Sequence, residues 1–178
     1  MDAKIQITAQ MMEKARDYLP LAVKEAWVAE NAPKCFDKLA ITADDEAMPP
    51  MYMVNTGLKS RYLMAALVGL YFNQEYDAEK DNAALMSIED YDAWGAGHVM
   101  NQIERFKHDP ALKFKAYDLV ADYKDLEKRF STQLSALMAV QNDFVIRQSQ
   151  MTSNMVKELP VLLEQLKELQ GKGEASAD

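Results

Sequence analysis

The chain has 178 residues, of which 49 % are apolar and 27 % are charged, proportions close to those of globular proteins. It carries 20 lysine and arginine residues against 28 aspartate and glutamate residues, which gives a net charge of −8. A negative chain repels phosphate groups at long range, which disfavours general binding to nucleic acid or to anionic membranes. Cys35 is the single cysteine, so an internal disulfide and a zinc site built on several thiolates are excluded.

The termini and the apolar runs bear on where the protein resides. The N-terminal residues lack a basic region followed by an apolar core, so we expect no secretory signal. The strongest apolar run, 62–72, is shorter than the roughly 20 residues that a membrane-spanning helix needs. We therefore expect a cytoplasmic protein that does not interact with membranes.

Helical periodicity begins near the N-terminus, where Thr8 can cap a first helix. Pro20 should either kink this helix or start a new one, and Pro33 ends or restarts the element. A short turn is expected over 34–40. The buried face of the helical region is predicted to contain Met12, Ala15, Leu19, Ala22, Ala26 and Ala29.

The middle of the chain is predicted to alternate loops and helices. Residues 41–55 look like a loop, in which a short strand at 51–54 would lack an evident partner. A core helix over 56–73 is apolar on every side in its middle, and a polar, acidic loop follows at 73–82. Ser87 begins a further helix, which ends near His108.

The last predicted helix carries the strongest pattern. Apolar residues repeat at spacings of three and four, and ten of the twelve positions of this seam are apolar. The ten apolar residues are Leu112, Ala116, Leu119, Tyr123, Leu126, Phe130, Leu137, Val140, Phe144 and Met151. Gln133 and Arg147 occupy the other two positions, where polar residues would set the register at a cost in stability.

The length of this helix bears on its partner. An unbroken helix over 110–158 would be roughly 70 Å long, more than a compact domain of this size can cover. A break at 131–132 or at 142–143 is the alternative, and Pro160 is expected to interrupt the final helix. We therefore expect an N-terminal helical core over 1–109, a heptad-patterned helix with a terminal helix over 110–170, and a disordered tail over 171–178.

Two groups of residues are candidate metal ligands. Asp77, Glu79 and Asp81 resemble the start of an EF-hand calcium loop, but Ile88 stands where that loop needs a bidentate glutamate. Glu104 and His108 lie one helical turn apart and could share a metal ion. The chain has two histidines and no Glu-x-x-His motif, so structural roles are favoured for these residues.

Charge is concentrated in two further stretches. Residues 73–92 hold seven acidic side chains against one lysine, so they would attract a basic partner, with helix N-terminal stabilisation as the plainer interpretation. Residues 105–115 form a basic elbow that could bind a phosphate group or the acidic stretch of another copy. No aromatic interleaving accompanies the elbow, which disfavours nucleic acid as its ligand.

These observations predict an all-α fold: an elongated helical bundle of about five to six helices with a long, coiled-coil-like C-terminal helix. No motif for a cofactor or for catalysis is found, and Cys35 lacks a recognisable catalytic setting. We expect a non-enzymatic interaction or self-assembly protein that buries its seam against another copy or against a helical partner. A metal- or ligand-binding helical enzyme using carboxylates with His98 or His108 is the second hypothesis, and a nucleic-acid-associated regulator is the third.

Overall fold

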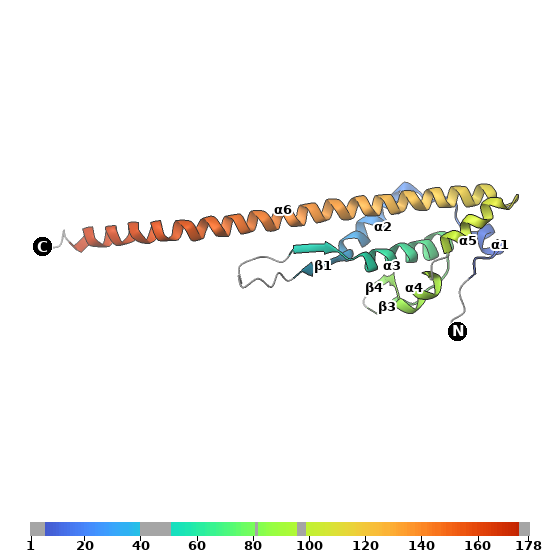
Figure 1. The fold of residues 1–178 in the computed structure, drawn as a ribbon, viewed down its shortest axis with the longest axis horizontal. Coiled ribbons are helices and arrows are strands. Elements are labelled where there is room, and N and C mark those ends of the chain that lie inside the picture. The colour runs from blue at the N-terminus through green and yellow to red at the C-terminus, as the bar shows by residue number, and fades with distance from the viewer. Residues whose placement is uncertain (1–5, 40–50, 81, 96–98, 175–178) are drawn as a thin grey trace. The chain divides into compact units, whose positions relative to one another are not determined.

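The computed structural model describes residues 6–39, 51–80, 82–95 and 99–174, and most of them are helical, as predicted. The chain divides into two compact units. Unit 1 comprises Met1–Asp37 and Val54–Leu137, and unit 2 comprises Lys38–Met53 and Met138–Asp178. In Figure 1 the helices of unit 1 gather around the first part of the last helix.

Unit 1 opens with two short helices in place of one. Helix α1 spans Ala9–Lys14 and is capped as predicted, because the Thr8 side chain accepts a hydrogen bond from the Met11 amide at 3.2 Å. Helix α2 spans Leu21–Asn31 and begins directly after Pro20, so the proline starts a new helix. A 3-10 turn, η1, follows at Ala32–Cys35.

A two-stranded sheet joins β1, Phe36–Leu39, to β2, Met51–Val54. The expectation that a strand at 51–54 would lack a partner is wrong, because the segment predicted to be a turn supplies β1. At the unit 1 end of this hairpin, the Asn55 amide donates to the Cys35 carbonyl at 2.8 Å. The predicted loop residues 40–50 lie outside the described residues.

The core helix is α3, Thr56–Ala66, which continues as a π-helical turn, η2, over Leu67–Tyr71. The Asn55 side chain caps α3 by accepting from the Leu58 amide at 2.9 Å. Every residue from Tyr62 to Phe72 is buried or half-buried, which confirms that this apolar run belongs to the core.

A second small hairpin replaces part of the predicted acidic loop. Strand β3, Ala78–Glu79, pairs antiparallel with β4, Asn82–Met86. Arg61 on α3 anchors both strands, since its Nε donates to the Met86 carbonyl at 2.8 Å and its guanidinium forms an ion pair with Glu79. Two-residue and five-residue strands are too short to show a clear alternation of apolar and polar residues, which is why the sequence pattern missed them.

The region predicted to form a single helix after Ser87 contains two described helices, and residues 96–98 between them lie outside the described residues. Helix α4 spans Ile88–Gly95, and helix α5 spans Val99–Arg105, followed by a 3-10 turn, η3, at Phe106–His108. Ser87 caps α4 as expected, because its hydroxyl accepts from the Asp90 amide at 3.1 Å.

Helix α6 spans Lys113–Glu174 without a break and is the longest element in Figure 1. At one of the predicted weak points, the Ser131 and Thr132 hydroxyls donate to carbonyls one turn earlier at 2.8 and 2.9 Å. The predicted interruption at Pro160 is wrong, because the helix continues through it. A proline removes a single backbone hydrogen bond, and here it lies on an exposed stretch where solvent can hydrate the freed carbonyl. Of the predicted tail, 175–178 lie outside the described residues.

The core of unit 1 forms where α6 meets α2, α3 and η2. The rings of Trp27 and Phe130 lie 4.8 Å apart, and those of Tyr71 and Tyr123 meet edge to face at 5.9 Å. No helix among the described residues combines the length and the apolar character needed to cross a membrane.

Candidate functional site

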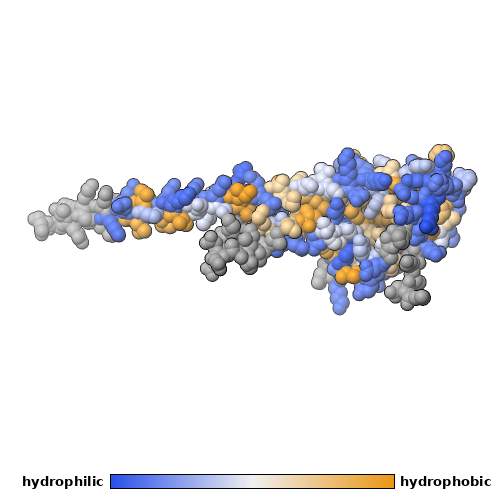
Figure 2. Space-filling view, in the orientation of Figure 1, coloured by the Kyte–Doolittle hydropathy of each residue, from blue (hydrophilic) through white to orange (hydrophobic). Residues whose placement is uncertain are grey.

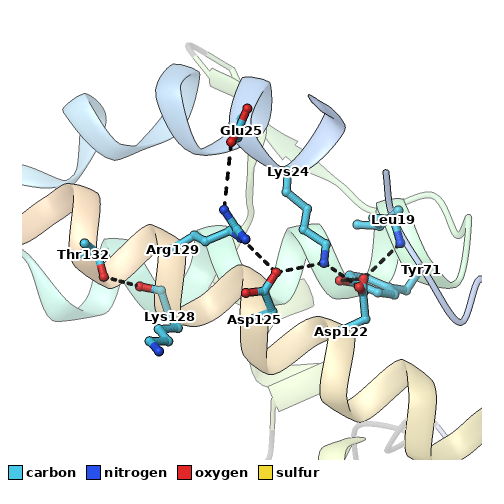
Figure 3. Close-up of polar contacts among 9 residues, drawn as sticks. All are labelled: Leu19, Lys24, Glu25, Tyr71, Asp122, Asp125, Lys128, Arg129 and Thr132. Atoms are coloured by element: carbon cyan, nitrogen blue, oxygen red, sulfur yellow. Dashed lines mark hydrogen bonds and ion pairs between the residues drawn. The ribbon is translucent and has the colours of Figure 1, made fainter. Parts of the chain in front are cut away.

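A buried charge network fastens α2 and η2 to α6 inside unit 1 (Figure 3). Asp122 on α6 accepts hydrogen bonds from the Leu19 amide at 2.9 Å and from the Tyr71 hydroxyl at 2.8 Å, and it forms an ion pair with Lys24. Asp122 and Lys24 are both buried. Both oxygens of this carboxylate therefore have partners within the chain, as a buried charge requires.

Asp125 extends the network toward solvent. Its Oδ2 accepts from Arg129 at 2.8 Å and from Lys24 at 3.0 Å, and these hydrogen bonds lower the pKa of the Asp125 carboxyl below its ordinary value. Burial lowers the pKa of Lys24, but its hydrogen bonds to Asp122 and Asp125 outweigh this effect and raise the pKa overall. The members of the network satisfy one another, so it has the character of a structural clamp.

The predicted interaction seam divides into a buried and an exposed part. Leu112, Leu119, Tyr123, Leu126 and Phe130 lie inside the core of unit 1. They contact the other helices of that unit, so another copy could reach them only if unit 1 opened.

The remaining seam residues lie farther along α6. Leu137 is partly buried against the core, whereas Val140, Phe144 and Met151 are exposed in unit 2. Four exposed residues continue the same line beyond the predicted seam: Met155, Leu159, Leu162 and Leu166.

We call Val140, Phe144, Met151, Met155, Leu159, Leu162 and Leu166 the distal stripe. Their exposed fractions lie between 52 % and 68 %. Figure 2 shows hydrophobic side chains alternating with hydrophilic ones along this part of α6. An exposed apolar line of this length is typical of a helix that packs against another helix.

The spacing of the distal stripe follows an eleven-residue repeat. Positions 137, 140 and 144 recur as 148, 151, 155 and again as 159, 162, 166, and eight of these nine are apolar, with Gln148 as the exception. The predicted heptad spacing would instead place the seam at 137, 140, 144, 147, 151, 154, 158, 161 and 165. Only five of these nine positions are apolar. Since eleven residues make about three turns of an α-helix, the stripe runs almost parallel to the helix axis.

The two flanks of the distal stripe differ in character. At 3.6 residues per turn, Asp143, Arg147 and Glu158 fall on one side of the stripe. Asp143 and Arg147 form an ion pair at 2.9 Å. On the opposite side fall the apolar residues Val145, Val156 and Leu163. The stripe is therefore bordered by a charged flank and an apolar flank.

Several of the candidate metal ligands form ion pairs or hydrogen bonds with other residues of the chain. Glu79 is paired with Arg61, the Asp77 amide donates to Asp90 at 2.6 Å, and Glu104 is paired with Lys107 at 3.2 Å. His108 lies in η3, while Asp81 and His98 lie outside the described residues. Within the described ranges, no group of three or more histidine, cysteine or acidic side chains is arranged to hold a metal ion.

The basic elbow is partly engaged within unit 1. The Lys115 ammonium donates to the Glu13 carbonyl at 2.6 Å, and Lys107 lies 5.1 Å from the centre of the Tyr117 ring. Cys35 is fully buried, and burial raises the pKa of its thiol to about 11, so the thiol is protonated at neutral pH and a poor nucleophile.

Comparisons with protein-family models, with curated proteins and with solved structures found no match to this chain. The functional argument therefore depends on the geometry of the chain itself. Sequence reasoning missed the clamp around Asp122, because a lysine and an aspartate 98 positions apart carry no local signal of pairing. It also ended the seam at Met151, where the next heptad positions, 154 and 158, hold Asn and Glu.

Proposed function

We propose that this protein is a self-associating helical protein, and that the distal stripe of α6 is the surface by which one copy binds another. The observation that supports this proposal is the line of large, exposed apolar side chains from Val140 to Leu166, in which Gln148 is the polar exception. Leaving such a line in water is unfavourable, and helices with a repeating apolar line commonly bury it against a second helix.

The size of the stripe suits a stable pairing. At about 25 cal/mol per Å², the 1.5–3 kcal/mol gained by burying one large apolar side chain corresponds to roughly 60–120 Å². The distal stripe can thus bury roughly 400–800 Å² on each copy, against the roughly 800 Å² per partner of a standard protein interface.

Charge favours a second copy as the partner. Residues 138–167 carry three acidic and three basic side chains, so this segment is neutral although the whole chain has a net charge of −8. Two copies of the segment can approach without net repulsion, whereas the rest of each chain repels its counterpart. This part of the chain is therefore the one best suited to self-association.

The proposal is tested by the mass of the protein in solution. We expect sedimentation analysis at micromolar concentration to give at least a dimer for the natural chain and a monomer for Phe144→Glu combined with Leu162→Glu. Ile146→Glu is the matched control, because Ile146 is exposed on the helix face opposite the stripe and its substitution should leave the assembly intact. A monomeric natural chain, or equal effects of the stripe and control variants, would refute the proposal.

A further inference from the structure

We infer that the second copy lies antiparallel, with a twofold axis at residue 153 of α6. This inference rests on the proposed function and specifies its geometry. It follows from the positions of the distal stripe along the helix and from the unequal character of its two flanks.

The apolar positions match across such an axis. In an antiparallel pair, residues equally far on either side of residue 153 face each other, which places Met151 against the partner's Met155. The same rule pairs Phe144 with the partner's Leu162, and Val140 with the partner's Leu166. Six of the seven stripe residues thus face an apolar residue of the partner, whereas Leu159 faces the partner's Arg147, and the arrangement occurs twice by symmetry.

The flanks distinguish this arrangement from a parallel one. In an antiparallel pair like flanks meet, so the apolar flank covers the partner's apolar flank and Val145 lies near the partner's Leu163. In a parallel pair the charged flank of each copy would lie against the apolar flank of the other, which would desolvate Arg147 and Glu158 without partners. The antiparallel arrangement avoids this cost.

The charged flank is also complementary to itself. Arg147 and Glu158 lie at nearly equal distances on either side of residue 153, so Arg147 of each copy lies beside the partner's Glu158. Gln148, the polar member of the repeat, approaches the same carboxylate and can donate a hydrogen bond to it. The two symmetric groups of charges fix the register, a role that polar groups play in other helical pairs.

Disulfide trapping tests the orientation. In a Cys35→Ala background, which removes the natural thiol, chains with Phe144→Cys and chains with Leu162→Cys are prepared separately and also coexpressed with different tags. A disulfide requires Cα atoms closer than about 7 Å. In the antiparallel pair two copies of position 144 are separated by roughly 27 Å along the helix, so only the mixed pair can form a disulfide.

We expect a covalent dimer from the coexpressed chains and none from either chain alone. A covalent dimer of Phe144→Cys with itself would overturn the antiparallel orientation while leaving self-association in place. A dimeric mass without a disulfide in any combination would overturn the axis at residue 153. A monomeric mass for the Cys35→Ala chain would count against both the inference and the proposed function, which separates that failure from the other two.

Discussion

At the scale of single residues, the Asp122 carboxylate is the polar group on which unit 1 most depends. It binds a backbone amide, a tyrosine hydroxyl and the buried Lys24, and so joins three parts of the chain. Burial and the hydrogen bond to this carboxylate raise the pKa of Tyr71 well above its ordinary value, so the hydroxyl keeps the proton that it donates. Without Asp122, the Leu19 amide and the Tyr71 hydroxyl would lose this acceptor, and Lys24 would keep Asp125 as its acidic partner.

Replacing Asp122 tests this role. Asp122→Asn leaves the Lys24 ammonium buried without its closest negative charge, and removing one partner of a buried ion pair typically costs about 3–5 kcal/mol. We expect a loss of this order in the free energy of unfolding, measured by urea denaturation. Asp118→Asn removes the same charge from an exposed position one turn earlier on α6, and should change stability by less than about 0.5 kcal/mol. Equal losses in the free energy of unfolding for the two variants would show that the buried clamp stabilises the fold no more than an exposed carboxylate does.

The residue scale also shows a limit of sequence-based inference. Lys24 lies in α2 among alanines and other charged residues, and nothing near it in the sequence distinguishes it from a solvent-exposed lysine. Its burial depends on a carboxylate far along the chain. Residues close together in the sequence, such as Asp77 and Glu79, readily suggest a candidate metal site. In the structure, however, Glu79 forms an ion pair with Arg61.

At the scale of elements, long periodic segments were predictable and short ones were not. The apolar seam identified α6 because its spacing persists over many turns, and Thr8 and Ser87 marked helix starts through their capping chemistry. The strands β1 and β3 contain four and two residues, too few for an alternating pattern to emerge. The change from a heptad to an eleven-residue spacing within α6 was missed because the heptad pattern was carried only to Met151.

The charged flank of α6 leads to a prediction at this scale. Arg147→Glu places a negative charge beside the partner's Glu158 at two symmetric positions, so we expect the dissociation constant to rise by about tenfold. Adding Glu158→Arg should restore the affinity. Residues 147 and 158 lie about three turns apart in one helix and cannot contact each other within a chain, so such a rescue must act between copies.

A matched double variant provides the control for this experiment. Arg147→Glu with Glu164→Arg has the same net charge, but Glu164 lies on the helix face opposite the stripe. We expect this double variant to self-associate as weakly as Arg147→Glu alone when the dissociation constants are measured by sedimentation equilibrium. Equal rescue by the two doubles would mean that net charge governs the affinity and not the pairing of Arg147 with Glu158.

At the scale of the whole molecule, the two units differ in what holds them together. Unit 1 has a continuous core and a buried charge clamp. Beyond residue 150, the side chains of α6 that the structure describes are all exposed, so few tertiary contacts support the helix there. Helices without tertiary contacts are marginally stable in water, so pairing between copies should supply the stability that this part of α6 lacks.

This difference gives the two units separate spectroscopic signals. The chain's two tryptophans, Trp27 and Trp94, both belong to unit 1, whereas much of α6 belongs to unit 2. On dilution through the dissociation range, we expect the helical circular dichroism signal to fall while the tryptophan fluorescence maximum stays constant. Phe144→Glu with Leu162→Glu should show the reduced helical signal at every concentration. A concentration-independent helical signal in the natural chain would show that distal α6 is stable alone, and a shift of tryptophan emission on dilution would show that unit 1 also depends on association.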